Sequence, residues 1–290
     1  MNIYSYKLAL HQPNPLNLSH REGILIEWDK THWGEIAPLE GWSSFTFQQL
    51  VAELPRMTFS EIKNRFPFAY ESAFLPPTQS EVHFAGLLYG TLDEMFRQAK
   101  VYKEQGFETL KLKVAQLSYQ ETLKLIQKLK KSFRLRIDPN QSWTLKRALK
   151  ISQHLDDIDY IEEPFSALQD SLAFAQKTGI PLAFDETPHN HPDFLQVVKP
   201  SANPHILPTS KNVLSSSFET GVGISNIIRW ALHTQNSYPI GIDTYRFLKE
   251  NILHSPLDLS TNPLNWKEKR LKISKEKLCL ICSVPSEGPR

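Results

Sequence analysis

The stretch TLKLKVAQLSYQETLKLIQKLKKSFRLRID, residues 109–138, decides the fold of this chain. Its two ends are short, apolar and alternating, which is typical of β-strands. Between them runs one apolar stripe at helical spacing, which consists of Leu123, Ile126, Leu129 and Phe133. A strand, a helix and a second strand in this order predict two parallel strands that are joined by a crossover helix.

The same rhythm of short strands and amphipathic helices extends from about residue 82 to about residue 243. The predicted strands cover residues 82–88, 109–115, 134–138, 159–163, 180–186, 196–200, 212–217 and 239–243. Repeated βα units imply a parallel sheet, and eight of them predict an α/β fold of the closed (β/α)8-barrel type. The strands that end near Asp185, Lys199 and Ser215 follow one another too closely for full outer helices, so we expect a somewhat trimmed barrel.

The first quarter of the chain has a different, turn-rich pattern. Residues 23–28 and 33–39 are predicted to form a β-hairpin, and residues 45–54 a helix. We therefore expect a separate α+β domain over residues 1–79 and a barrel domain over residues 80–255.

The composition excludes several classes of protein. The 290 residues include 33 Lys or Arg and 31 Asp or Glu, so the formal net charge of +2 is too small for a general nucleic-acid binder. No apolar run approaches the roughly 20 residues of a membrane helix, and we expect no signal peptide. Two cysteines exclude a disulfide scaffold and favour a cytoplasmic location. We expect a small-molecule partner, with no nucleic acid and no membrane, and the oligomeric state stays open.

Charged residues stand at the carboxyl ends of five consecutive predicted strands. They are Lys113, Asp138, Glu162, Asp185 and Lys199, at intervals of 25, 24, 23 and 14 residues. The carboxyl ends of barrel strands meet at one mouth, where active sites are built. The spacing therefore predicts three carboxylates side by side, flanked by two lysines.

Three clustered carboxylates repel one another unless a cation neutralises them. Their hard oxygen ligands favour Mg²⁺, with Mn²⁺ as a possible substitute, over Zn²⁺. Lys111 and Lys113 lie two apart on one strand, so both face the same side. With the metal present, we expect the two lysines to lower each other's pKa, as a lysine that acts as a general base requires.

The motifs in these strands resemble those of the enolase superfamily, muconate-lactonizing-enzyme subgroup, and within it the o-succinylbenzoate synthases. Five motifs occur in order: KxK (Lys111, Lys113), DxNxxW (Asp138, Asn140, Trp143), EEP (Glu162 to Pro164), DE (Asp185, Glu186) and the lysine of VVKP (Lys199). The synthase branch is further resembled by GEIAPLEGWS at residues 34–43, REG at 21–23, SSS at 215–217 and GID at 241–243.

The resemblance implies an enolase-like barrel with an N-terminal α+β capping domain, which part of residues 256–290 joins. It implies a lyase of menaquinone biosynthesis that carries out the syn-dehydration of 2-succinyl-6-hydroxy-2,4-cyclohexadiene-1-carboxylate to 2-succinylbenzoate. The reaction would proceed through α-proton abstraction by a lysine and a metal-stabilised enediolate.

The resemblance also implies a role for each matched residue. Asp138, Glu162 and Asp185 would hold Mg²⁺. Lys113 would take the α-proton, and Lys199 would stabilise the anion from the opposite face. Supporting roles fall to Lys111, Arg136 and Asn140, and substrate binding falls to Ser215, Ser216, Ser217 and Gly241.

These residues also have simpler structural interpretations. The lysines of residues 111–113 fit a solvated strand edge, and Asp138 fits a turn or a helix cap. Arg136 fits an ion pair with a neighbouring acid, and Glu219 and Thr220 fit caps of the following helix. Two pairs resemble metal or redox motifs but fit a loop and an apolar strand better, namely His189 with His191 and Cys279 with Cys282.

Rival activities remain open in the sequence. An N-acylamino acid racemase or a muconate cycloisomerase-like enzyme of the same subgroup uses the same lysines. Dipeptide epimerases usually carry an acidic DxD pair on the eighth strand, whereas this strand ends in GIDT, residues 241–244. A noncatalytic barrel is the remaining alternative, which the retention of every motif lysine and carboxylate disfavours.

Overall fold

The computed structural model describes residues 1–185, 193–267 and 270–285. The chain divides into two compact units, each of which is considered by itself. Unit 1 consists of Met1–Val82, Val198–Asp258 and Asn265–Arg290, and unit 2 of His83–Val197 and Leu259–Leu264. The expected boundaries of the two domains, residues 1–79 and 80–255, stay a prediction, because these two units group the segments by packing alone.

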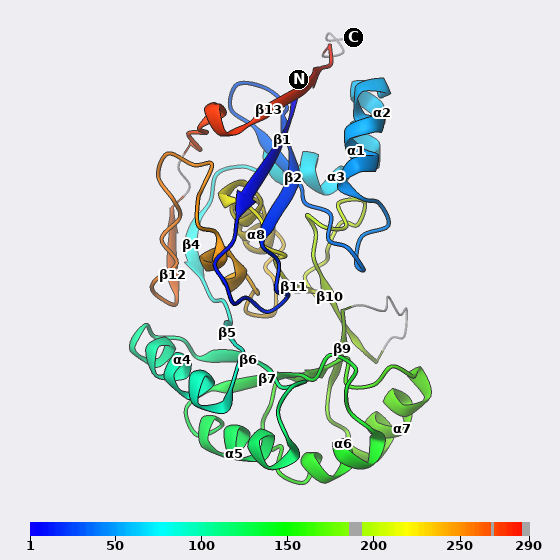
Figure 1. Ribbon diagram of the computed structural model, residues 1–290, viewed down its shortest axis with the longest axis vertical. Helices are drawn as coiled ribbons and strands as arrows, with labels where there is room; N and C mark the ends of the chain where they lie inside the picture. Colours follow the sequence, from blue (N-terminus) through cyan, green and yellow to red (C-terminus); the bar gives the residue numbers. More distant parts are fainter. Residues whose placement is uncertain (186–192, 268–269, 286–290) are drawn as a thin grey trace. The chain divides into compact units, whose positions relative to one another are not determined.

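Unit 2 is built on a parallel sheet with helices along one face (Figure 1). In sheet order the strands are β5 (Gly86–Leu88), β6 (Thr109–Lys113), β7 (Arg134–Asp138), β8 (Tyr160–Glu162), β9 (Leu182–Phe184) and β10 (Leu195–Val198). The helices are α4 (Leu92–Glu104), α5 (Tyr119–Leu129), α6 (Leu145–Ser152) and α7 (Leu168–Thr178). The predicted βα rhythm is confirmed over this region.

Helix α5 shows how closely the residue pattern sets these elements. Ser118 is its N-cap and forms a capping box with Glu121, so the helix begins where the first free amides find an acceptor. Its buried apolar stripe is Leu125, Ile126 and Leu129, together with Thr122. The predicted stripe was therefore wrong at two positions: Leu123 is only half-buried, and Phe133 lies beyond the helix end, where it is buried in its own right.

Unit 1 contains an antiparallel sheet in the order β13 (Cys279–Ser283), β1 (Asn2–Ala9), β2 (His20–Glu27) and β3 (Trp33–Ile36). The helices that follow are α1 (Phe47–Glu53), the 3-10 turn η1 (Leu54–Arg56), α2 (Phe59–Arg65) and α3 (Pro67–Phe74). One face of β2 packs against these helices through Ile24 and Ile26, while Leu25 on its other face packs against Val222 of α8 (Gly221–His233). Burial on both faces explains why this strand reads as a continuous apolar run.

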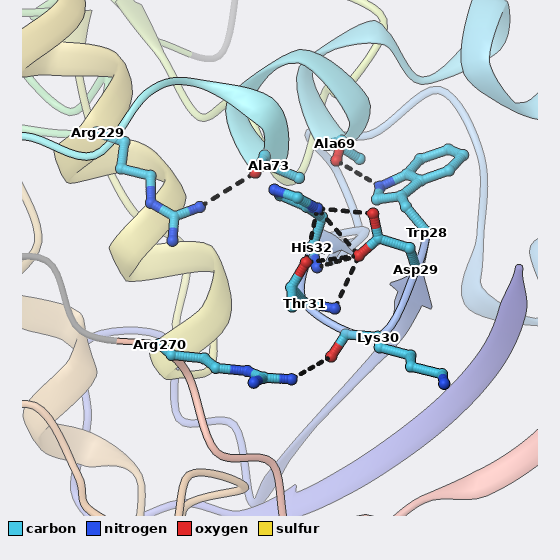
Figure 2. Close-up of polar contacts among 9 residues, drawn as sticks. All are labelled: Trp28, Asp29, Lys30, Thr31, His32, Ala69, Ala73, Arg229 and Arg270. Atoms are coloured by element: carbon cyan, nitrogen blue, oxygen red, sulfur yellow. Dashed lines mark hydrogen bonds and ion pairs between the residues drawn. The ribbon is translucent and has the colours of Figure 1, made fainter.

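The predicted hairpin of β2 and β3 is confirmed, and Asp29 forms its turn (Figure 2). Its Oδ1 accepts the amide N–H of Thr31 at 2.7 Å and that of His32 at 2.9 Å, which is the local bonding that favours Asp in turns. Beside the turn, Trp28 Nε1 donates to the carbonyl of Ala69 on α3 at 2.9 Å. The hairpin is thus tied to the helices that cover it.

The last two predicted strands of the parallel series lie in unit 1. Strand β11 is Val213–Leu214, and the N–H of Ser215 donates to the carbonyl of Val198 at 2.9 Å. The predicted eighth strand, residues 239–243, is reduced to isolated bridges at Ile240 and Gly241, and Gly241 forms its bridge with Ser215 in parallel orientation. It runs into the 3-10 turn η2 (Asp243–Phe247).

The remaining elements are short. Strands β4 (Gln79–Val82) and β12 (Leu264–Lys267) form a two-stranded sheet, and η3 (Lys275–Lys277) precedes β13. Residues 199–212, all described, contain no helix, so the expected loss of the sixth outer helix is confirmed. In the described part of the chain, no helix combines the length and the apolar character needed to span a bilayer.

Candidate active site

Lys111 joins two carboxylates at the carboxyl end of the parallel sheet in unit 2. Its Nζ lies 2.6 Å from Oε1 of Glu162 and 3.0 Å from Oδ2 of Asp138. The residues come from β6, β7 and β8, which are consecutive in the sheet, so their carboxyl ends place the three side chains together.

Lys113 lies on the same face as Lys111 and contacts a different pair of groups. Its Nζ lies 3.1 Å from Oδ2 of Asp138 and donates to Oδ1 of Asn140, also at 3.1 Å. The N–H of Asn140 donates back to Oδ1 of Asp138 at 3.1 Å. Asn140 has a φ of 44°, the left-handed region that Asn tolerates better than most residues. This turn presents the amide oxygen to the lysine.

The carboxylates are deeply buried, whereas the lysines keep some exposure. Asp138 is 1% exposed and Glu162 is 2% exposed. Burial raises the pKa of Asp138, but the ammonium groups of Lys111 and Lys113 outweigh this effect and hold that pKa below its ordinary value. Burial likewise lowers the pKa of Lys111, but the nearby carboxylates raise it well above its ordinary value. The mutual lowering of the two lysine pKa values that is expected with bound metal stays a prediction.

Glu163 and Gln141 form a second layer of contacts that the sequence did not single out. Glu163 is buried, and its Oε1 accepts from Nε2 of Gln141 at 3.1 Å. Its Oε2 accepts the N–H of Asp185 at 3.1 Å, so it fixes the residue that follows β9. The two adjacent glutamates were the sequence signal that could have indicated these contacts. Glu162 faces the lysines, and Glu163 forms hydrogen bonds at the end of the neighbouring strand.

Arg136 is fully buried and forms an ion pair with Asp159, with 2.9 Å between Nε and Oδ2. Its guanidinium also lies over the ring of Tyr160, 5.2 Å from the centroid. These contacts match the structural interpretation of Arg136. Trp143 is buried. Its backbone N–H donates to the carbonyl of Pro164, and this bond joins the loops after β7 and β8.

The donor set of unit 2 has the chemistry of a site for a hard divalent cation. Asp138 and Glu162 end β7 and β8, and Asp185 directly follows β9. Within residues 1–185, 193–267 and 270–285, no three His, Cys, Asp or Glu side chains are arranged closely enough to hold a metal. The Lys111 ammonium instead bridges Asp138 and Glu162, which shows that a cation is accommodated between these two carboxylates. Carboxylate oxygens of this kind are the ligands that Mg²⁺ prefers.

The other predicted site residues lie in unit 1. Lys199 follows β10, and its Nζ lies over the ring of Trp42, 5.2 Å from the centroid. Ser216 Oγ donates to the carbonyl of Gly241 at 2.8 Å, and Ser217 Oγ donates to Oε1 of Glu219 at 3.0 Å. These residues form a second group, with its own network of contacts.

Three residues of the sequence analysis lie outside the described residues: Glu186, His189 and His191. Cys279 and Cys282 are free thiols on β13, consistent with the interpretation of this segment as a strand.

Comparison with known proteins agrees with the motifs and the fold. Residues 94–212 match the family model of enolase C-terminal domain-like proteins. An o-succinylbenzoate synthase of Pasteurella multocida (strain Pm70) is 29% identical, with 90% of this chain and 94% of that protein covered.

Two solved structures share the fold. The crystal structure of o-succinylbenzoate synthase from Thermosynechococcus elongatus BP-1, complexed with magnesium in its active site, matches with a TM-score of 0.72 and 23% identity, covering 89% of this chain and 97% of that one. A muconate lactonizing enzyme of Pseudomonas fluorescens matches with a TM-score of 0.71 and 16% identity, covering 95% and 96%. In its strand-end motifs, its fold and its relatives, this chain is similar over most of its length to o-succinylbenzoate synthases, and residues 94–212 match the enolase C-terminal domain-like family.

Proposed function

We propose that this chain is an o-succinylbenzoate synthase, which dehydrates 2-succinyl-6-hydroxy-2,4-cyclohexadiene-1-carboxylate to 2-succinylbenzoate in menaquinone biosynthesis. One observation carries the proposal. Two lysines and two buried carboxylates meet at the ends of β6, β7 and β8, in a chain of which a curated relative of that name covers 90%. Such a set of groups suits proton abstraction next to a carboxylate.

Lys113 is the proposed base. Its Nζ contacts one carboxylate and one amide oxygen, whereas Lys111 contacts two carboxylates, which stabilise its ammonium form. Neutral Lys113 takes the proton from the carbon next to the substrate carboxylate. The resulting Lys113 ammonium then gives this proton to the departing hydroxyl on the same face. Water leaves, and the ring becomes aromatic with its carbon skeleton unchanged.

Asp138, Glu162 and Asp185 are the proposed ligands of Mg²⁺, for which Mn²⁺ is a possible substitute. The metal, when bound, would neutralise the negative charge that grows on the substrate carboxylate, which is usually the largest contribution to such catalysis. Lys111 keeps Asp138 and Glu162 paired, and Asn140 orients Lys113.

The roles of Lys199, Ser215, Ser216, Ser217 and Gly241 rest on the sequence resemblance. Lys199 would stay protonated and stabilise the anion from the face opposite to Lys113. The serines and Gly241 would bind the substrate's carboxylate side chain. We also propose a cytoplasmic enzyme with a small-molecule carboxylate as its substrate, without nucleic-acid or membrane partners.

An N-acylamino acid racemase or muconate cycloisomerase-like activity is the second candidate, because the fold is shared with a muconate lactonizing enzyme and both lysines are retained. A racemase would use Lys113 and Lys199 as a two-base pair, whereas a synthase needs only Lys113 as base.

Turnover of freshly made 2-succinyl-6-hydroxy-2,4-cyclohexadiene-1-carboxylate, followed by ultraviolet absorbance, tests the proposal. We expect conversion with Mg²⁺ and loss of conversion with EDTA. Folded, metal-loaded protein that leaves this substrate unchanged would contradict the synthase activity. Exchange of the α-proton of N-succinylamino acids in D₂O would then identify a racemase, and a lack of exchange would favour a noncatalytic barrel.

A further inference from the structure

Glu219 is a fully buried carboxyl group in unit 1 to which the proposed mechanism gives no role. It stands between Ser217 and the start of α8 and is 0% exposed. We define residues 215–218 as the serine loop, since they contain the three serines that the sequence places at the substrate.

Glu219 bonds the serine loop through both of its carboxylate oxygens. The N–H of Ser217 donates to Oε2 at 2.5 Å, and the hydroxyl of Ser217 donates to Oε1 at 3.0 Å. On the other side, Nε of Arg21 donates to the carbonyl of Ser217 at 2.9 Å. The peptide groups on both sides of Ser217 are therefore held by buried charged side chains, which make stronger hydrogen bonds than neutral ones.

The serine loop needs this support because its backbone is strained. Phe218 has a φ of 63°, a left-handed conformation that an aromatic residue rarely adopts. Its N–H donates to Oγ1 of Thr244 at 3.0 Å. Such a conformation persists only where the surroundings over-determine it, and Glu219 supplies two of the contacts that do so.

The loop contacts leave one serine hydroxyl for a ligand. Ser216 Oγ bonds Gly241 and Thr244, and Ser217 Oγ bonds Glu219. Within the described part of the chain, the hydroxyl of Ser215 makes no hydrogen bond to protein. Glu219 and Thr244 thus fix the loop while a neighbouring hydroxyl stays available.

Glu219 is not the cap of α8, contrary to the interpretation from sequence. Thr220 is the N-cap, and its side chain accepts from the N–H of Val222. The amides of Thr220 and Gly223 donate to Glu35 at 3.0 Å and 2.8 Å. The start of the helix is therefore satisfied without Glu219, which leaves the serine loop as the partner of its carboxylate.

We propose that Glu219 is a positioning residue: it holds the main chain at Ser217 so that the serine loop is ordered to receive the carboxylate side chain of the substrate. The inference rests on the proposed function for the identity of the ligand. It concerns the order of a loop, and that order can be measured without substrate.

The charges around Glu219 give this role a dependence on pH. Burial is the main cause that raises the pKa of Glu219 to about 7; the buried Glu35 raises it further, and Arg21 lowers it. Tyr6 also faces this group and donates to Glu35 at 2.7 Å. Ionised Glu219 accepts both donors of Ser217, whereas the protonated acid has one oxygen that carries a proton. We expect the loop to be held better above pH 7 than below it.

Two variants test the proposal. Glu219→Ala removes both acceptors, and Glu219→Gln mimics the protonated acid at every pH. Loss of hydrogen bonds to a charged group predicts a KM that rises about tenfold or more in Glu219→Ala, with a smaller change in kcat. In the wild type, KM should rise as the pH falls from 8 to 6, whereas in Glu219→Gln it should be independent of pH. Glu71→Gln, an exposed glutamate of the same unit, serves as the matched control.

Amide hydrogen exchange of the peptide that covers residues 215–218 provides a readout apart from activity. We expect faster exchange in Glu219→Ala than in the wild type and in Glu71→Gln, and slower exchange in the wild type at pH 8 than at pH 6 once intrinsic rates are corrected. Unchanged exchange and unchanged KM in a folded Glu219→Ala would overturn the positioning role. If Glu219→Ala does not fold, the comparison of Glu219→Gln with the wild type decides. The positioning role is then overturned if the KM of Glu219→Gln depends on pH as that of the wild type does. A wild type that exchanges as expected but does not turn over the substrate would contradict the proposed function alone.

Discussion

Lys111 on β6 reaches across β7 to Glu162 on β8, with 2.6 Å between Nζ and Oε1, although these two strands are not neighbours in the sheet. The same ammonium lies 3.0 Å from Asp138 on the strand between them. One amine therefore holds together two buried carboxylates that would otherwise repel each other. These are two of the three groups that we propose as ligands of the metal.

Replacement of Lys111 should reveal this pairing. Lys111→Met leaves two buried carboxylates without their shared ammonium, so in EDTA we expect the free energy of unfolding to fall by about 3–5 kcal/mol. Mg²⁺ should recover more stability in the variant than in the wild type, because it replaces the missing positive charge. Chemical denaturation with and without Mg²⁺ measures both effects. Lys100→Met, on the exposed face of α4, is the control, and equal stability of the two variants in EDTA would contradict the pairing.

Substitutions at Asn140 distinguish its backbone role in the turn from the role of its side chain beside Lys113. At a φ of 44°, Gly is tolerated and Ala is strained, by about 1 kcal/mol. We expect Asn140→Ala to lose both stability and activity, and Asn140→Gly to stay close to wild-type stability while losing activity, since neither variant offers an oxygen to Lys113. Thermal unfolding and turnover measured on the same samples separate the roles. An active Asn140→Gly would show that the amide does not orient Lys113.

Glu163 should affect the metal without touching it. Its carboxylate fixes the N–H of Asp185 and the side chain of Gln141, so Glu163→Ala should loosen a proposed metal ligand. Loss of such a supporting contact typically weakens metal affinity by about 10–100-fold. Titration of activity with Mg²⁺ measures the change. Glu163→Gln retains one acceptor oxygen and should be affected less, and equal Mg²⁺ affinity in all three proteins would exclude this role.

Glu219 should also make stability depend on pH. Its pKa of about 7 in the folded chain exceeds the ordinary value of 4.5, so the folded state binds the proton more tightly. The stability that this group contributes is complete below about pH 4.5 and is lost as the pH rises through 7. Relative to Glu219→Gln, the wild type should therefore lose about 2–3 kcal/mol between pH 5 and pH 8. Urea unfolding at both values measures the difference, and a constant or opposite difference would contradict the raised pKa.

The strand ends of unit 2 could be predicted from sequence because parallel strands repeat at nearly constant intervals. Lys111, Lys113, Asp138 and Glu162 are brought together as that regularity implies. The bracing by Glu163 could not be predicted, since alternation along a strand does not say what the residue after its end contacts. The stripe of α5 was misplaced because Leu123 and Leu125 both fit a helical period, and only packing distinguishes them.

The sequence was less informative where elements are short. Residues 239–243 read as a strand, yet they form only isolated bridges at Ile240 and Gly241, because the chain turns at once into η2. The burial of Glu219 was also missed. A glutamate after a run of serines is typical of a polar helix cap. Its contact with Ser217 depends on the left-handed turn at Phe218, which the residue pattern does not predict.

The turnover of Lys113→Ala on 2-succinyl-6-hydroxy-2,4-cyclohexadiene-1-carboxylate at saturating Mg²⁺ tests the central claim most directly. With Lys113 as the base, we predict a loss of at least about 10³-fold relative to the wild type and to the control Lys100→Ala. A folded Lys113→Ala that keeps turnover close to that of the wild type would contradict the assignment of the base and the mechanism built on it.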